Sequence, residues 1–383
     1  MEYPSIFDDI RPYDEHEVVQ AMQDIAMDKT FPVLSKFVFP NLSLEEVRAL
    51  FSSLKNIDDF QSKIMYQANK QIMARSITEM TVGGMEKLDP SKRYLFVSNH
   101  RDIMLDASLL QNSLKDYGHE TAQITFGANL MRGDMVVNIG KSNKMFRVER
   151  GGNMKAFYES SKHLSDYIRY VITERNESVW IAQRNGRTKD GNDITDPGVL
   201  KMFSLSSEKS FSENLDELNI CPVSVSYEYE PCDFLKTREL CISTTTEKYQ
   251  KSPLEDMLSI KQGVMQNKGR IHLSVCKPVS SADLKECDSH NKNEKFSALA
   301  EIIDNRIING YKTHNTNHIA YDILKNTSKF SAEYTDEEKN SFEKYMKAGL
   351  LEYSKDFNGM SEEFFLKIYA NPVINQLEKT HTL

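Results

Sequence analysis

The pattern of apolar and polar positions predicts strands that alternate with helices through the middle of the chain. Short apolar runs that end in turn residues are typical of buried strands, whereas apolar residues three and four apart are typical of helices. Helices are predicted from about Asp106 and over residues 155–174. Strands are predicted within residues 94–97, 120–130, 145–152, 177–183, 219–231 and 269–280. This alternation predicts an α/β fold with a mixed central sheet flanked by helices.

Helical spacing dominates both ends of the chain. Apolar residues recur at helix spacing from about Asp14 to Met80, and again from about Glu294 onward. At 383 residues the chain is long enough for two domains or one enlarged domain. We therefore predict a helical N-terminal region, an α/β domain and a helical C-terminal region, over residues 1–80, 81–285 and 286–383 respectively.

One aromatic segment near the N-terminus has two interpretations. Residues 31–39 read FPVLSKFVF, an apolar stretch with a single lysine. Packing of these side chains on the core is the interpretation that we favour. Contact with a membrane surface is the alternative, because apolar segments with a basic residue can lie in the membrane interface.

The charge balance separates classes of ligand. A net charge of −8 argues against a dedicated nucleic-acid-binding protein, which is usually basic. Residues 129–155 run against this balance, with six basic and two acidic residues. A basic patch in an acidic protein points to an anionic ligand or an anionic membrane surface. The basic residues are Arg132, Lys141, Lys144, Arg147, Arg150 and Lys155.

Two further features indicate the compartment. The sequence shows neither the layout of a signal peptide nor an apolar run long enough to span a bilayer. The five cysteines are scattered and form no C-x-x-C pair, which argues against a zinc site or a disulfide framework. We therefore expect a cytoplasmic protein that would meet lipids from the membrane surface.

The predicted strand at residues 94–97 leads directly into a histidine and two carboxylates. Asn99 and His100 end the strand, and Asp102 and Asp106 follow. Open α/β sheets carry reactive groups at such strand ends, and an imidazole beside a carboxylate can act as a general base near neutral pH. His100 is therefore the leading catalytic candidate. On a continuous helix neither carboxylate would reach the imidazole, so a turn must intervene, and a capped helix start is the plainer interpretation of this cluster.

Two later segments combine arginine with glycine. Residues 146–152 read FRVERGG, and residues 183–191 read QRNGRTKDG after a predicted strand. Arginine supplies forked donors and glycine lets the backbone come close, which suits a phosphate group. In the second segment Arg184, Arg187 and Lys189 surround a glycine, which favours an anionic headgroup. For each segment a solvated charged loop is the alternative.

Taken together, four segments resemble the glycerophospholipid acyltransferase superfamily. That family carries an Asn-His and Asp block, a block that ends in arginine after a Phe-x-Val/Ile pattern, a Gly-Arg loop and a Pro-Val strand. The matching segments are Asn99–Asp106, Phe146–Arg150, Gly186–Arg187 and Pro222–Tyr227, so the resemblance covers about residues 81–280. No single block is specific, and the last one alone would be taken for an ordinary core strand. All four in this order are much harder to obtain by accident.

The chain departs from the family pattern in two blocks. Four residues usually separate the histidine from the aspartate, whereas five separate His100 from Asp106. Asp106 is our choice as the partner of the histidine, and Asp102 is the rival. A glutamate usually precedes the glycine of the third block, where this chain has Gln183, Arg184 and Asn185. The identity of the acceptor therefore stays open.

The resemblance implies an O-acyltransferase of phospholipid biosynthesis, peripheral on the inner face of the membrane. It would move a fatty acyl group from acyl-CoA or acyl carrier protein to a hydroxyl of glycerol 3-phosphate or a lysophospholipid, without a metal or a further cofactor. His100 would take the proton of the acceptor hydroxyl, and the aspartate would orient the imidazole. The resemblance implies these substrate-binding residues: Asn99, Arg150, Arg184, Gly186, Arg187 and Lys189.

Three alternatives stay open beside this function. The acceptor could be the hydroxyl of a lyso-aminolipid, because the family's glutamate is missing. The protein could be an acyl thioesterase, which releases fatty acid without an acceptor. It could also be a non-catalytic protein that binds anionic lipid through the same basic loops.

Overall fold

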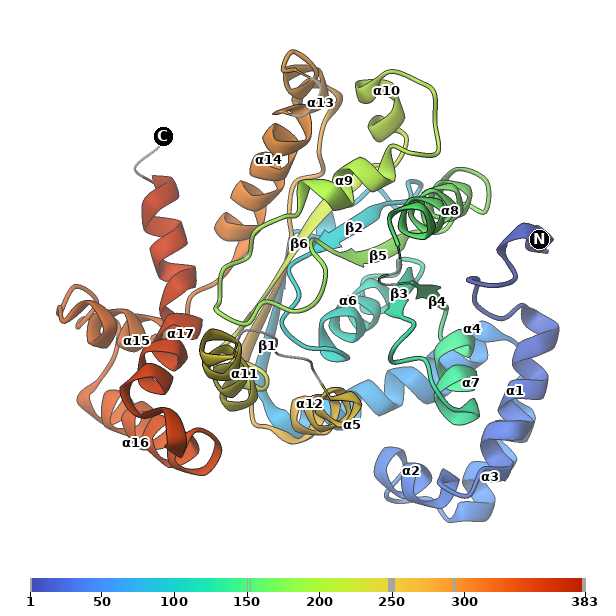
Figure 1. Cartoon of the computed structure of the whole chain (residues 1–383). Coiled ribbons are helices and arrows are strands. Elements are labelled where there is room, and N and C mark those ends of the chain that lie inside the picture. The colour runs from blue at the N-terminus through green and yellow to red at the C-terminus, as the bar shows by residue number, and fades with distance from the viewer. Residues whose placement is uncertain (1, 150, 152, 247–251, 292–293, 381–383) are drawn as a thin grey trace.

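A mixed sheet forms the centre of the computed structural model, which describes residues 2–149, 151, 153–246, 252–291 and 294–380 (Figure 1). Within these residues seven strands pair in the order β1-β7-β6-β2-β5-β3-β4. All neighbours are parallel except β6 and β7, so the predicted mixed α/β sheet is confirmed. The strands are β1 (Ile77–Gly83), β2 (Leu95–Ser98), β3 (Gln123–Gly127), β4 (Met145–Val148), β5 (Val179–Ala182), β6 (Ile220–Tyr227) and β7 (Gly269–Val275).

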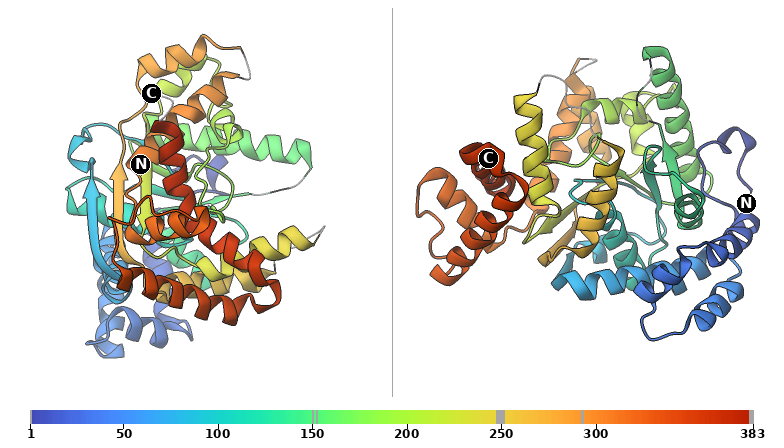
Figure 2. Two further views of the ribbon diagram at one scale, coloured as in Figure 1. Left: turned by 90° about the vertical axis from the view of Figure 1, so that its left-hand side faces the viewer. Right: turned by 60° about the horizontal axis from the view of Figure 1, so that its bottom comes forward.

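Helices cover both faces of this sheet and form both ends of the chain (Figures 1 and 2). The first half contains α1 (Glu15–Met27), α2 (Phe31–Val38), α3 (Leu44–Ser53), α4 (Ile57–Phe60), α5 (Tyr66–Ser76), α6 (Leu105–Asp116), α7 (Asp134–Ser142) and α8 (Met154–Thr173). The second half contains α9 (Pro197–Phe203), α10 (Phe211–Asp216), α11 (Asp233–Thr245), α12 (Pro253–Met265), α13 (Ser281–Asp288), α14 (Glu294–Gly310), α15 (Asn315–Lys325), α16 (Asp336–Tyr353) and α17 (Asn358–Thr380). Short helical turns occupy Ser5–Phe7, Gln61–Met65, Met85–Lys87 and Lys355–Phe357.

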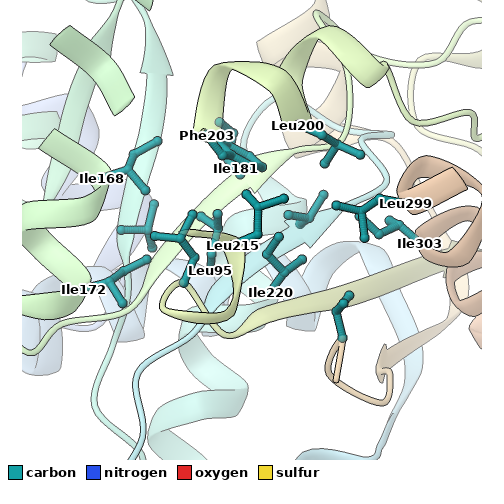
Figure 3. Close-up of a cluster of buried hydrophobic side chains, with 14 of the residues drawn as sticks. Leu95, Ile168, Ile172, Ile181, Leu200, Phe203, Leu215, Ile220, Leu299 and Ile303 are labelled. Atoms are coloured by element: carbon teal, nitrogen blue, oxygen red, sulfur yellow. The ribbon is translucent and has the colours of Figure 1, made fainter. Parts of the chain in front are cut away.

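The two faces of the sheet bury separate apolar clusters. Leu95 and Val97 of β2 belong to one cluster, whereas Phe96 between them belongs to the other. Successive strand residues point to opposite faces, and both faces are covered, so the strand is apolar throughout. Figure 3 shows the first cluster, in which β2, β5 and β6 meet α8, α9, α10 and α14.

The N-terminal helical region ends earlier than predicted. Helical spacing was expected to continue to about Met80, but α5 ends at Ser76 and β1 begins at Ile77. β1 therefore crosses the boundary proposed between residues 80 and 81. Its β-branched residues suit a strand, yet its partner β7 lies about 190 residues later, so no local hairpin signal marks it.

Packing divides the predicted C-terminal region in two. Leu299, Ile303 and Ile307 of α14 join the cluster on the central sheet. The helices α15, α16 and α17 instead form their own cluster with Phe234 of α11. In the chain, α14 lies between β7 and the helices α15, α16 and α17, and it packs on the central sheet rather than with those helices.

Candidate active site

A buried asparagine, Asn99, holds the turn that follows β2. The chain passes through residues 99–104 before α6 begins. The side-chain amide of Asn99 donates to Asp193 (3.0 Å) and to the Val225 carbonyl (3.1 Å), and its oxygen accepts from the Val225 N–H (2.8 Å). Asn99 is fully buried, and its hydrogen bonds to Val225 hold the turn on β6. It does not line the cavity that lies beside His100, which is described below.

His100 and Asp106 lie within hydrogen-bonding distance of each other. Nδ1 of His100 is 2.9 Å from Oδ2 of Asp106. Asp106 is the second residue of α6, so the turn before the helix supplies the approach that a continuous helix would forbid. A carboxylate can only accept, so Nδ1 carries the shared proton and Nε2 is the proton acceptor of the neutral ring.

Asp102, the rival carboxylate, accepts from backbone N–H groups just before and at the start of α6. Its Oδ1 accepts from the backbone N–H groups of Met104 and Leu105, each at 2.8 Å. This satisfies two of the donors that a helix start leaves unpaired. Its Oδ2 is buried without a hydrogen-bond partner in the described part of the chain. Two aspartates thus have different partners: Asp102 accepts from backbone N–H groups near the helix start, and Asp106 pairs with His100.

Asp106 is surrounded by donors. Besides His100, its Oδ2 accepts from the N–H groups of Arg101 (2.6 Å) and Asp102 (2.9 Å), and its Oδ1 accepts from the Tyr227 hydroxyl (2.7 Å). Burial by itself raises the pKa of Asp106, but these hydrogen bonds, led by that of His100, hold the pKa below its ordinary value. The site therefore contains a fixed carboxylate anion beside the imidazole.

A buried ion network fixes the residue that follows the histidine. The Arg101 guanidinium donates to Asp193 (2.6 Å) and Glu230 (3.1 Å). Lys236 donates to Glu230 (2.6 Å) and to the Arg101 carbonyl (2.8 Å). Two cations and two carboxylates thus balance one another out of contact with water, and removing any one of them would leave a buried charge unpaired.

A cavity of about 250 Å³ lies beside His100. Arg187, Lys189 and Asp256 form its polar part together with the histidine. The His100 and Trp180 rings meet edge to face, with centroids 5.6 Å apart. The apolar part includes Ile103, Met104, Ile124, Phe126, Leu130, Met145 and Trp180. A lining that includes both basic and apolar side chains suits a ligand that combines an anionic group with an acyl chain.

The predicted basic loop meets the histidine through its backbone. The Thr188 N–H donates to the His100 carbonyl (2.9 Å). Beside it, Arg187 is buried in the cavity wall, and its Nη1 has no hydrogen-bond partner among the described residues. Gly186 also lines the cavity, with a φ of +75° that favours glycine.

The other predicted basic residues differ in their placement. Lys189 lines the cavity and forms an ion pair with Glu239. Arg184 is half-buried and does not line the cavity. Arg150 lies outside the described residues. Three of the implied substrate contacts, Gly186, Arg187 and Lys189, are therefore brought to the histidine.

The basic excess within residues 129–155 does not converge on the cavity. Arg147 pairs with Glu149 at 2.7 Å, and Lys144 is 3.9 Å from Glu177. Of the basic residues that this segment contributes to the described structure, none lines the cavity beside His100. Two of these basic residues are thus paired with nearby carboxylates, and the expectation of an anionic ligand for the whole patch stays a prediction.

Sequence patterns missed several residues that hold the site. By itself the block that ends at Tyr227 reads as an ordinary core strand, yet the Tyr227 hydroxyl donates to Asp106. Asp193, Glu230 and Lys236 carry no sequence signal of this role. Each lies at least 90 residues from the turn that it contacts, so no local spacing reveals it. The one available signal was a tyrosine in a buried strand, because its hydroxyl needs a partner.

Two absences hold for the described residues. No group of three or more His, Cys, Asp or Glu side chains there could hold a metal ion. No helix in the described ranges is both long and apolar enough to pass through a bilayer.

Comparisons with known proteins bear on the same segment. Among solved structures, the crystal structure of the 1-acyl-sn-glycerophosphate (LPA) acyltransferase PlsC from Thermotoga maritima is 11% identical, covers 76% of this chain and 94% of that chain, and has a TM-score of 0.37. No curated protein matches the chain. A family model described as Acyltransferase matches residues 79–226, which contain His100, Asp106 and Arg187. This match confirms the predicted resemblance, and residues 79–226 carry an acyltransferase-family domain.

Proposed function

We propose that the protein transfers a fatty acyl group from an acyl thioester to a hydroxyl of glycerol 3-phosphate or a lysophospholipid. The observation that carries the proposal is the His100–Asp106 pair beside a cavity that also contains Arg187. The acyltransferase match over residues 79–226 supports the class of reaction. The proposed donor is acyl-CoA or acyl carrier protein, and the proposed place is the cytoplasmic face of a membrane.

In this mechanism His100 is the general base. Nε2 takes the proton of the acceptor hydroxyl while that oxygen attacks the carbonyl carbon of the thioester. The C–O bond forms, the C–S bond breaks, and the leaving sulfur takes up the proton from the imidazolium. Asp106 keeps Nδ1 protonated and offsets the transient positive charge. No acyl-enzyme is required, because two substrates held together gain rate from proximity.

Arg187 is the proposed contact for the phosphate of the acceptor. Its Nη1 is a buried donor with no partner in the described chain, and an unpaired buried donor costs about 1–3 kcal/mol. A phosphate oxygen in the cavity would accept from it. Lys189 lies in the same wall, where Glu239 already holds it, so we assign it the smaller share of binding.

The test is thiol release from long-chain acyl-CoA by the purified protein, with glycerol 3-phosphate, lysophosphatidate or no acceptor. We expect release that depends on an acceptor and falls about 100-fold or more in His100→Ala and Asp106→Asn, because a general base and its partner contribute on that order. The matched control is His163→Ala. His163 also pairs with an aspartate, Asp9 at 3.0 Å, but does not line the cavity, so its loss should leave the rate unchanged.

The other outcomes separate the alternatives. Release without an acceptor would favour a thioesterase. Release only with a lyso-aminolipid would keep the mechanism and change the acceptor. No release with any acceptor, repeated with acyl carrier protein as the donor, would contradict the proposal and favour a lipid-binding role.

A further inference from the structure

Three helices pack in a row along one edge of the molecule. The helix α5 contacts α2 on one side and α12 on the other. All three lie along the lower edge in Figure 1, and this edge comes forward in the right-hand view of Figure 2. We call this edge the α2–α5–α12 face.

The helix α12 turns apolar side chains toward solvent. Leu254 and Met257 are each 66% exposed, and Leu258 and Met265 are exposed as well. These positions are three, four and eleven residues from the first one, so they share one side of the helix. The apolar outer side of α12 is therefore not covered by any other part of the described structure, and exposed apolar patches of this kind often mark interaction sites.

The inner side of α12 touches the candidate active site. Asp256 lines the cavity beside His100 and accepts from the Asn129 amide at 3.0 Å. Further along, Gly263 packs so tightly that a Cβ there would lie 2.2 Å from Oδ2 of Asp102. The apolar outer side of α12 and the cavity are therefore separated by the thickness of one helix.

The helices α2 and α5 carry cations beside apolar groups. Val33, Lys36, Phe37 and Arg75 line one shallow depression. The Arg75 guanidinium lies 4.3 Å from the centre of the Phe37 ring and donates to the Phe37 carbonyl. Val33 is 73% exposed. Interleaved basic and apolar side chains are typical of segments that lie in a membrane interface.

The charge of this face opposes that of the whole protein. The helices α2 and α5 contain Lys36, Lys70 and Arg75 and no acidic residue. The helix α12 adds Lys261, and its two carboxylates are engaged locally, in the helix cap and with Asn129. Lys70 lies 3.8 Å from Asp116 of α6, so Lys36, Arg75 and Lys261 are the cations that this face offers in a protein of net charge −8. Such cations are complementary to an anionic lipid surface.

We propose that the α2–α5–α12 face docks on an anionic phospholipid bilayer. Its exposed apolar side chains enter the boundary of the acyl chains, and its lysines and arginine meet the headgroup phosphates. Docking through α12 brings the cavity beside His100 to an acceptor held in the membrane. This proposal rests on the proposed function for the identity of the acceptor, but not for the docking itself.

The test is co-sedimentation of the full chain with vesicles of phosphatidylcholine alone or of equal phosphatidylcholine and phosphatidylglycerol. We expect binding to the anionic vesicles, weakened by added salt. The double variant Leu254→Glu/Met257→Glu should bind about tenfold more weakly or worse, because two exposed apolar side chains that would enter the membrane become charged. The matched control is Met154→Glu on α8, where the methionine is 92% exposed and the helix lies away from the lower edge in Figure 1.

Three results would overturn the docking proposal: no binding of the wild type to anionic vesicles, unchanged binding in the double variant, or an equal loss in the control. Capture of an acidic carrier protein through the same residues, without vesicle binding, would also overturn it. The His100→Ala variant should still bind, because sedimentation requires no turnover. Acyl transfer to soluble glycerol 3-phosphate without vesicle binding would contradict the docking but not the proposed reaction. Vesicle binding without acyl transfer would contradict the proposed reaction but not the docking.

Discussion

At the scale of single residues, the site depends on how the two oxygens of Asp106 are shared. Oδ2 faces His100, and Oδ1 accepts from the hydroxyl of Tyr227. Burial, together with the charge of Asp106, raises the pKa of Tyr227 well above its ordinary value, so this hydroxyl stays protonated and donates. Tyr227 does not line the cavity. It is therefore a positioning residue that acts through the carboxylate.

Tyr227→Phe is expected to lower kcat about tenfold and to leave KM nearly unchanged, because one hydrogen bond to a charged group is lost away from the substrate. The ionised form of Asp106 loses a donor, so its pKa rises and the acidic limb of the kcat profile moves to higher pH. Steady-state acyl transfer across the pH range measures both effects. The control is Tyr94→Phe, from the same apolar cluster, in which only stability should change. If the pH profile of kcat in Tyr227→Phe matched that of the wild type, the Tyr227 hydroxyl would have only a structural role.

At the scale of elements, the decisive feature is where α6 starts. If the helix had begun at His100, the imidazole and Asp106 would point in different directions. The helix instead begins at Leu105, where Asp102 accepts from its first N–H groups. The hydrogen bonds of Asp102 therefore help to set where α6 starts, and with it the geometry of the His100–Asp106 pair.

Asp102→Ala is expected to lower the free energy of unfolding by about 1 kcal/mol, because two backbone N–H groups at the start of α6 lose their acceptor. Asp102→Asn should cost less, because an asparagine side chain can still accept from the helix start. Both variants should keep most of the acyltransfer rate, unlike Asp106→Asn. Urea denaturation and the thiol-release assay measure the two quantities. A loss of rate in Asp102→Ala as large as that in Asp106→Asn would return the catalytic role to Asp102.

At the scale of the whole molecule, a buried carboxylate connects the C-terminal helices to the site. Asp233, at the start of α11, accepts from the hydroxyls of Tyr345 (2.8 Å) and Tyr369 (2.6 Å) in α16 and α17. The Tyr369 hydroxyl in turn accepts from the N–H of Glu230, whose side chain pairs with Arg101. The C-terminal helices thus reach the turn of the histidine through two buried carboxylates.

Burial raises the pKa of Asp233 to about 6 from an ordinary 3.8. The folded protein therefore binds this proton more tightly than the unfolded chain. The stabilising contribution is complete below about pH 4 and is lost as the pH rises through about 6, on the order of 3 kcal/mol in total. Asp233→Asn lacks this titration, so the stability of the wild type relative to the variant should fall by most of that amount, about 2.5 kcal/mol, between about pH 4 and pH 7.

Denaturant unfolding of both proteins at the two pH values measures the difference. Using the difference between wild type and variant cancels the titration of all other groups that the substitution leaves undisturbed. A difference that stays constant with pH would mean that Asp233 is ionised in the folded protein at both values.

The sequence by itself determined most elements of the central sheet and the residue types of the site. Burial on both faces makes strands such as β2 and β5 continuous apolar runs, and this signal is local. The order of the four blocks, through residue type and spacing alone, pointed to His100, Arg187 and an acyltransferase. β1 was not predicted, because it follows α5 directly and pairs with β7, which lies about 190 residues later.

Only the tertiary structure decided which groups meet. Asp102 and Asp106 are equivalent by composition and nearly so by spacing, and the start of α6 separates their roles. The pairing of Arg101 with Asp193 and Glu230, like the contact of Tyr227 with Asp106, joins positions about 90 to 130 residues apart. A local pattern encodes burial and secondary structure, but hydrogen-bond and ion pairing depend on where the chain folds back on itself, and that is a property of the whole fold.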